Sequence, residues 1–155
     1  MESIIKLEIK TFGDHNVLAD KISAIIKEYY IEYCKTKSCI NSYKDIKSFE
    51  DACQYLKVTP ESIIKNQTEQ RFINQLKLET IIKSLNEGWK PNFNDNNQKK
   101  YYNYFKMENG SFVFCDTTYY YRLMSVPSAL YLKDEQTAIY CKDNFFDLYK
   151  EYYGC

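Results

Sequence analysis

The chain has 155 residues and carries equal numbers of cationic and acidic side chains, 21 of each. The two signs are mixed along the chain, which argues against an extended surface for nucleic-acid phosphates. This length is typical of one domain with a sizeable core, and the 16 Tyr and 9 Phe exclude a disordered chain. We therefore expect one domain over residues 1–155, with an N-terminal strand and helix in residues 1–47 and the remaining elements in residues 48–155.

The sequence indicates neither a membrane segment nor a secretion signal. No apolar run approaches the ~20 residues that a membrane-spanning helix needs. Lys6, Glu8 and Lys10 interrupt the apolar residues near the N-terminus, where a secretion signal would be continuous. We therefore expect a cytoplasmic protein whose six cysteines are reduced.

The N-terminal part predicts a strand, a helix and a loop, in that order. Apolar and charged residues alternate over residues 3–12, which is the period of a strand. From about Asn16 to Cys34 apolar residues recur three and four apart, which is the period of an amphipathic helix. Turn-favouring side chains in residues 35–47 then predict a loop that acts as an internal hinge.

Capping signals predict the next helices. Ser48 begins a short helix, with Asp51 at the position of a capping-box acid. Thr59 and Pro60 begin a second short helix as its cap and first residue. A longer helix follows over residues 68–87 and ends at Gly88, because glycine readily takes the left-handed conformation of a helix C-cap.

The C-terminal half predicts a small sheet and a last helix. An Asn109-Gly110 pair between two aromatic runs is a strong hairpin signal. The expected strands are residues 102–107, 111–115, 119–123 and 129–132. A final helix over residues 134–152 has an apolar face made of Ala138, Cys141, Phe145, Leu148 and Tyr152.

Together these elements predict an α+β fold. The N-terminal half is helical, and a small antiparallel sheet of three or four strands follows it. The two amphipathic helices, residues 68–87 and 134–152, flank this sheet, because each must bury its apolar face against a neighbouring layer.

No set of residues predicts catalysis. The single histidine, His15, has no marked nucleophile or orienting group, so it is interpreted as a helix-entry residue. The adjacent acids Glu50-Asp51 and Asp134-Glu135 lie at expected helix starts, where the helix dipole favours negative charge. Four scattered glycines cannot build a phosphate loop. We therefore expect no enzyme, no catalytic residue and no cofactor.

One cysteine group resembles half of a metal site. Cys34 and Cys39 are separated by four residues and Cys53 follows, so a structural zinc ion is conceivable. Zinc sites commonly combine two closely spaced ligand pairs, and a second pair is missing here. Unpaired cytoplasmic thiols are the alternative that we favour, and we expect no metal.

Aromatic runs with neighbouring cations are the one feature that points to binding. The candidate partner-binding residues are Lys99, Lys100, Tyr101, Tyr102, Tyr104, Tyr119, Tyr120, Tyr121 and Arg122. Strand alternation sends half of each run into the core, where tyrosine supplies apolar area. The exposed half would suit a protein partner, because Tyr and Arg are enriched at interface hot spots. It would also suit stacking with single-stranded nucleic acid.

Several segments from residue 81 to 153 are shared with a known group of proteins. They are Leu85-Asn86-Glu87-Gly88-Trp89-Lys90-Pro91, Lys100-Tyr101-Tyr102, Tyr104-Phe105 and Asp147-Leu148-Tyr149-Lys150-Glu151-Tyr152. A further shared piece is Lys47-Ser48-Phe49-Glu50-Asp51-Ala52-Cys53 with Val58-Thr59-Pro60-Glu61. On these residues the chain resembles uncharacterised small proteins encoded by phages and mobile elements of Bacteroidetes-type bacteria. That group has Pro where this chain has Asn103.

This resemblance implies a genomic context and not an activity. Phage proteins of this size without catalytic residues often bind and disable host defence enzymes, anti-CRISPR proteins among them. We therefore expect a non-enzymatic inhibitor of a host protein, most concretely an RNA-guided nuclease. Its binding surface would include exposed tyrosines of the sheet or the loop of residues 35–47. The alternative is a single-stranded nucleic-acid-binding accessory protein of phage replication. An enzyme with substrate-assisted chemistry is a third hypothesis.

Overall fold

The computed structural model describes residues 20–26, 28–29, 40–122 and 125–155. The chain separates into two compact units, residues 1–39 and 40–155. In the first unit the described residues are helical, which agrees with the middle of the expected helix. The strand expected at residues 3–12, His15 and the pair Cys34 and Cys39 lie outside the described residues. The expectation of one domain stays a prediction.

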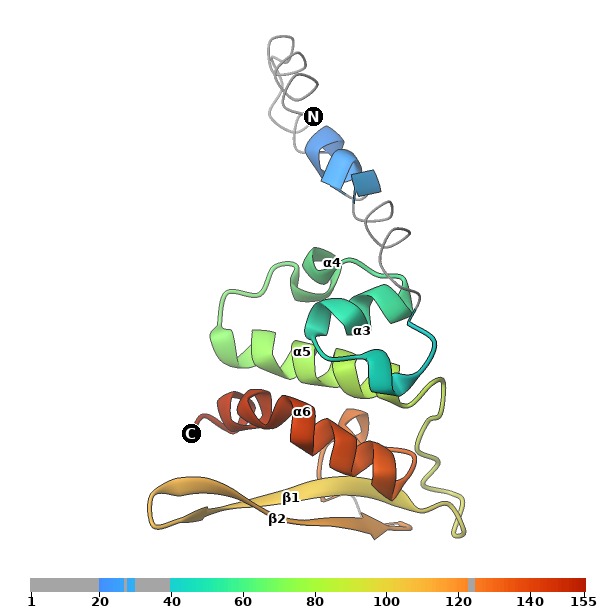
Figure 1. Ribbon diagram of the computed structural model, residues 1–155, viewed down its shortest axis with the longest axis vertical. Helices are drawn as coiled ribbons and strands as arrows, with labels where there is room; N and C mark the ends of the chain where they lie inside the picture. Colours follow the sequence, from blue (N-terminus) through green and yellow to red (C-terminus); the bar gives the residue numbers. More distant parts are fainter. Residues whose placement is uncertain (1–19, 27, 30–39, 123–124) are drawn as a thin grey trace. The chain divides into compact units, whose positions relative to one another are not determined.

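The second unit is a layered α+β fold, as the sequence predicts. Its elements are the 3-10 helices η2 (Tyr43–Asp45) and η3 (Ser128–Leu130), the α-helices α3 (Phe49–Leu56), α4 (Pro60–Ile64), α5 (Gln70–Leu85) and α6 (Glu135–Tyr153), and the strands β1 (Lys100–Glu108) and β2 (Ser111–Tyr120). The hairpin of β1 and β2 forms one layer and α6 lies along it (Figure 1). Helix α5 packs on the other side of α6, and α3 and α4 pack on α5.

The caps of the short helices follow the sequence signals. The side chain of Ser48 accepts a hydrogen bond from the Asp51 N–H at 3.1 Å, and the side chain of Thr59 accepts one from the Ser62 N–H at 3.3 Å. The Asp51 carboxylate accepts from the Lys47 N–H at 3.0 Å, one residue earlier than a capping box requires. Local side-chain chemistry therefore sets both helix starts.

The end of α5 differs from the expected glycine cap. The helix ends at Leu85, and its C-cap is Asn86 in a right-handed conformation. The Asn86 amide group binds the Tyr131 carbonyl at 2.8 Å, and its oxygen accepts from the Lys133 N–H at 3.0 Å. These two bonds tie the helix end to the segment before α6. The chain turns away afterwards, with Gly88 at a positive φ of 89°.

The hairpin is confirmed, and it is longer than expected. Asn109 and Gly110 take positive φ angles of 51° and 78°, as a two-residue turn between right-twisted strands requires. Strand β2 continues through Tyr119 and Tyr120, so the separate strand expected at residues 119–123 is wrong.

The strand expected at residues 129–132 is also wrong. This segment forms η3 and then a single bridge between Leu132 and Tyr101. The sheet in the described part of the chain therefore has two strands instead of three or four.

The two faces of the hairpin have different surroundings. Tyr101, Asn103 and Phe105 alternate onto the face that α6 covers, where Phe105 lies 4.8 Å from the ring centroid of Tyr149. The intervening residues face away from α6, and we call that side the outer face. Helix α6 is the layer next to the sheet, and α5 packs on α6, whereas the sequence predicted that both helices cover the sheet.

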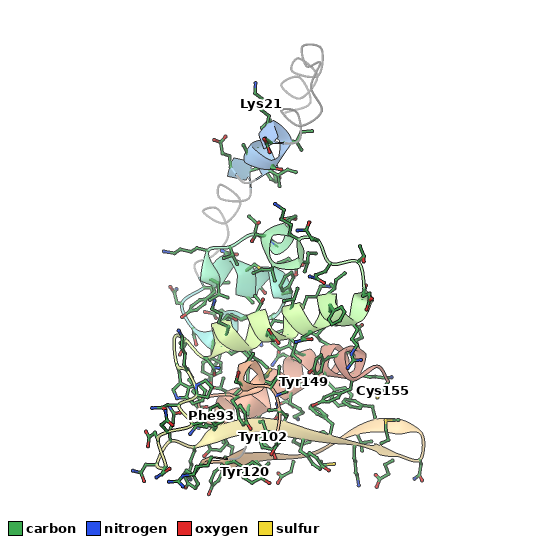
Figure 2. The ribbon with its side chains drawn as sticks, turned by 180° about the vertical axis from the view of Figure 1, so that it is seen from behind. Lys21, Phe93, Tyr102, Tyr120, Tyr149 and Cys155 are labelled. Carbon is green, nitrogen blue, oxygen red and sulfur yellow. The ribbon has the colours of Figure 1, made fainter. Side chains whose placement is uncertain are left out.

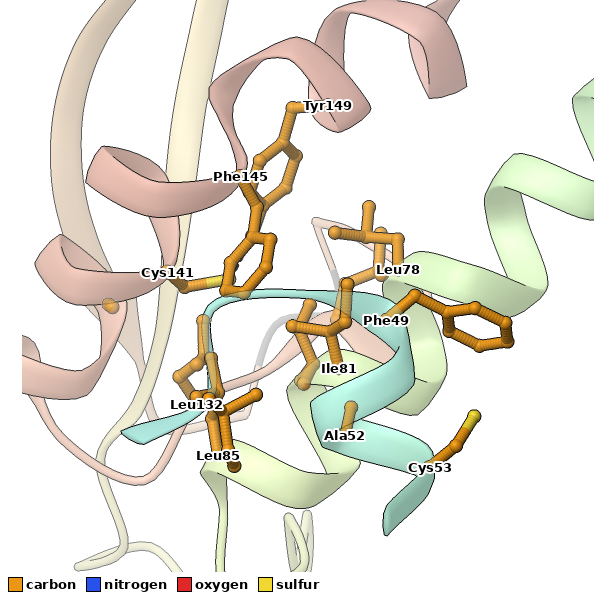
Figure 3. Packing of buried hydrophobic residues seen from close by; sticks show 14 residues of the cluster. Phe49, Ala52, Cys53, Leu78, Ile81, Leu85, Leu132, Cys141, Phe145 and Tyr149 are labelled. Carbon is orange, nitrogen blue, oxygen red and sulfur yellow. Dashed lines mark hydrogen bonds between the residues drawn. The ribbon is translucent and has the colours of Figure 1, made fainter. Parts of the chain in front are cut away.

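The main core lies between the helices (Figure 3). Its buried residues are Ile46, Phe49, Ala52, Cys53, Leu78, Ile81, Ile82, Leu85, Leu130, Leu132, Ala138, Cys141, Phe145 and Tyr149. The apolar face expected for the last helix is confirmed at Ala138, Cys141 and Phe145. Leu148 and Tyr152 are only partly buried, because Tyr149 takes the inward position instead.

Candidate functional site

Four of the candidate residues form one group at the end of the hairpin far from its turn, and all of them except the partly buried Tyr101 are exposed. The Tyr119 ring lies 5.2 Å from the Tyr101 ring and 5.5 Å from the Tyr121 ring, and the Lys99 ammonium lies 4.3 Å from the Tyr119 ring centroid. We call Lys99, Tyr101, Tyr119 and Tyr121 the aromatic–cation cluster. Tyr119 and Tyr121 are 38% and 39% exposed. Exposed tyrosines are thus present at this end of the sheet, and their binding of a partner stays a prediction.

The cluster has a defined electrostatic character. The hydroxyl groups of Tyr101 and then Tyr119 raise the pKa of Lys99. Arg122, also exposed, donates from Nε to the Asn96 side-chain oxygen beside the end of β2. A cationic group thus lies against the aromatic rings at this surface, in an otherwise charge-balanced chain.

Lys100 is a correction to the list of candidates, because it is fully buried. Its ammonium donates to the carbonyl oxygens of Gln98 and Tyr121, both at 2.8 Å, and of Asp95 at 3.3 Å. It also lies 5.4 Å from the Phe93 ring centroid. These bonds fasten the loop before β1 to the end of β2. Lys100 is therefore a structural residue that supports the cluster and cannot itself contact a partner.

Replacement of Lys100 by methionine is expected to lower the free energy of unfolding by about 2 kcal/mol, because three partly buried hydrogen bonds to carbonyl oxygens are lost. Lys99→Met is the matched control, since it removes an exposed ammonium one residue away and should cost less than about 1 kcal/mol. Urea unfolding followed by circular dichroism measures both. Equal losses in the two variants would contradict the structural role of Lys100.

Tyr102 is a second correction. Its ring is buried on the outer face, stacked 5.7 Å from Tyr120 and meeting Tyr131 edge-on at 5.8 Å. Burial raises the pKa of the Tyr102 hydroxyl. Figure 2 shows Tyr120 on the side of the hairpin opposite Tyr149 of α6. Tyr104 lies farther along the outer face and is 55% exposed.

An open groove runs beside β1. Its volume is about 750 Å³, and residues 102–107 of β1 line its length. The remaining lining residues are Phe112, Asp116, Thr118 and Tyr120 of β2, and Ser125, Val126, Tyr153 and Cys155. Its lining is mainly aromatic and aliphatic, without a convergent set of charged groups, so it is shaped for an extended apolar or backbone contact.

A buried polar chain joins the hairpin to α6, and sequence reasoning missed it. The Asn103 amide group donates to the Ala138 carbonyl at 2.9 Å, and its oxygen accepts from the Thr117 hydroxyl at 2.8 Å. The Tyr149 hydroxyl lies 3.5 Å from the Cys141 sulfur. An asparagine at an inward position of an aromatic strand is the signal that could have revealed it.

This polar chain has no nucleophilic character. Burial raises the pKa of the Cys141 thiol to about 12, so the thiolate that would attack a substrate is not populated at neutral pH. Burial also raises the pKa of Tyr149 well above its ordinary value. The arrangement fits a structural link between two layers.

Neither a metal-ligand group nor a membrane-spanning helix is present in the part of the chain that the structure describes. In residues 20–26, 28–29, 40–122 and 125–155, no three His, Cys, Asp or Glu side chains are grouped so as to hold a metal ion. In the same residues, no helix has the length and apolar character to cross a membrane.

Comparisons with known proteins give no relative. The chain matches no protein-family model, no curated protein and no solved structure. The resemblance to proteins of phages and mobile elements therefore stays a prediction, and function has to be argued from the surface of this chain.

Proposed function

We propose that this protein is a non-enzymatic inhibitor that binds a host defence protein, most concretely an RNA-guided nuclease, and that it is encoded by a phage or mobile element. The observation that supports the proposal is the aromatic–cation cluster. Tyrosine side chains combine a large apolar ring with a hydroxyl that can bond across an interface, and they lose little conformational entropy on binding. Lys99 adds a charge for pairing with an acidic group of the partner.

The packing of the cluster favours a protein partner over nucleic acid. The Tyr119 and Tyr121 rings meet at an interplanar angle of 81°, and Lys99 lies over the Tyr119 ring. Base stacking needs free ring faces, and Lys99 occupies one face of the Tyr119 ring. The balanced charge of the chain also provides little phosphate neutralisation, which dominates affinity for nucleic acid.

The alternative function, binding of single-stranded nucleic acid in phage replication, rests on Lys99 and Arg122 flanking the tyrosines. The two functions differ in their response to salt, because affinity for nucleic acid falls steeply as salt is raised. Binding to single strands at physiological salt that is lost in Tyr119→Ala would favour this alternative.

The test uses purified effector complexes, nuclease with guide RNA, from bacteria that carry the element. The full chain is expected to bind one of them and to block cleavage of its target at stoichiometric concentration. In the double variant with Tyr119→Ala and Tyr121→Ala, affinity is expected to fall about 30-fold or more, because it removes two centrally placed aromatic anchors.

Tyr104→Ala is the control for this test, since it removes an exposed tyrosine of the same hairpin outside the aromatic–cation cluster. It is expected to retain binding and inhibition. Failure of the full chain to bind any of these effectors would contradict the proposed function. Equal losses of affinity in the double variant and in Tyr104→Ala would contradict the assignment of binding to the aromatic–cation cluster.

A further inference from the structure

Strand β1 has a free edge. On one side it pairs with β2 along its length, and on the other side Tyr101 exchanges two backbone bonds with Leu132, at 3.1 and 2.8 Å. Backbone groups of an antiparallel strand point alternately to its two neighbours. The N–H and C=O groups of Asn103, Phe105 and Met107 therefore point to the same side as those of Tyr101. The described residues provide no backbone partner for them.

Beyond Tyr101 this edge borders an open groove. The groove of about 750 Å³ is lined by residues 102–107, together with side chains of β2 and with Ser125, Val126, Tyr153 and Cys155. Large apolar side chains remain accessible at the same place, with Tyr104 55% and Met107 54% exposed. An uncovered edge with exposed apolar side chains is a template for another strand.

We propose that a second copy of this chain occupies the edge, with its own β1 antiparallel and centred on Phe105. Leu132 blocks the edge at Tyr101, and the turn at Asn109 and Gly110 ends the strand on the other side. The three unpaired edge residues are therefore symmetric about Phe105, which suits a two-fold interface that uses the same patch twice. Each would exchange two backbone bonds with a residue of the partner subunit.

Side chains in this register are complementary. On the outer face Tyr104 lies opposite the partner's Lys106. The two-fold symmetry places Lys106 opposite the partner's Tyr104 in the same way, so each lysine ammonium faces a tyrosine ring. The two Lys106 side chains are diagonal neighbours, and each already pairs with its own Glu108 at 2.7 Å, which neutralises their repulsion. The result is a continuous four-stranded sheet, β2-β1-β1-β2, that buries Tyr104 and Met107.

The dimer does not depend on the proposed inhibitor function. The aromatic–cation cluster lies at the end of the hairpin that Leu132 borders, outside residues 103–107. Dimerisation therefore leaves the cluster of each copy free.

Sedimentation equilibrium of the full chain over a range of concentrations tests the dimer. The wild type is expected to shift from the monomer mass of 18.5 kDa towards twice that mass. Tyr104→Lys places two like charges opposite each other across the interface and is expected to raise the dimer dissociation constant about tenfold. Tyr104→Glu faces the partner's Lys106 and is expected to dimerise at least as tightly as the wild type. Tyr121→Lys, the matched control outside the edge, is expected to leave it unchanged.

Two further measurements separate this interface from any other. The amides of Asn103, Phe105 and Met107 are expected to exchange more slowly with solvent as concentration rises. Met107→Pro removes one edge N–H without touching a bond to β2, so it is expected to stay folded by circular dichroism and to remain monomeric. A wild type that is monomeric throughout would overturn the proposal. A dimer whose edge amides gain no protection, or equal effects of Tyr104→Lys and Tyr104→Glu, would overturn it as well.

Discussion

Replacement of Asn103 by alanine is expected to lower the free energy of unfolding by about 3 kcal/mol. Asn103 is buried between the hairpin and α6, where its amide group binds the Ala138 carbonyl and the Tyr149 hydroxyl, at 2.9 and 3.4 Å. Its oxygen accepts from the Thr117 hydroxyl at 2.8 Å. Alanine removes all three bonds and leaves polar groups in a site closed to water. Urea unfolding at neutral pH measures the loss.

Thr117→Val is the matched control for Asn103→Ala. It keeps the shape of the side chain and removes one of the same bonds, so it is expected to cost about 1 kcal/mol. The double variant is expected to cost less than the sum of the two single variants, because both changes remove the bond between these side chains. A loss below 1 kcal/mol in Asn103→Ala would show that water replaces the amide and that the link between the layers lies elsewhere.

The sequence predicted the local features of the fold because local side-chain chemistry determines them. Ser48 and Thr59 cap their helices through bonds to backbone groups three residues away. Asn109 and Gly110 form the hairpin turn because these residue types tolerate positive φ angles. Each of these signals is complete within a few residues and needs no knowledge of the rest of the chain.

The number of strands was not predictable in the same way. The aromatic residues up to Tyr121 have high β propensity, and propensity does not show whether they begin a new strand or continue an earlier one. Tyr119 and Tyr120 continue β2, because a register shift opposite Tyr104 and Phe105 absorbs one extra residue and lets the pairing resume. Leu132 pairs with Tyr101 at one position only, because η3 immediately precedes it.

The burial of candidate residues depends on distant parts of the chain. Lys100 and Tyr102 lie on the side of the hairpin away from α6, which alternation alone would leave exposed. The carbonyl groups of the loop before β1 surround the Lys100 ammonium, and the Tyr131 ring covers Tyr102. The sequence thus located the aromatic surface, and only the tertiary structure separates the residues that form it from those that support it.

Stability is expected to fall steeply as pH rises above about 9, by about 4 kcal/mol between pH 9 and 12 from one thiol alone. Burial raises the pKa of Cys141 from its ordinary value of 9.0 to about 12, and burial raises the pKa of Tyr149 in the same direction. In this pH window the folded protein retains protons that the unfolded chain releases. Because the unfolded state binds fewer protons than the folded state in this window, the free energy of unfolding decreases as pH increases. Below about pH 8 both states keep these protons, so Cys141 and Tyr149 contribute no pH dependence there.

Urea unfolding of Cys141→Ala and Tyr149→Phe at pH values from 7 to 11 isolates these two groups from the other tyrosines and lysines. Both variants lose packing or a hydrogen bond, so each is expected to be less stable than the wild type at pH 7. The informative quantity is the slope of the unfolding free energy against pH above pH 9, which is expected to be shallower in each variant. Cys155→Ala, which removes an exposed thiol at the end of the chain, is expected to keep the wild-type slope. An unchanged slope in Cys141→Ala would mean that the unfolded chain protects this thiol as well as the folded protein does, and the proton linkage would then have to come from other groups.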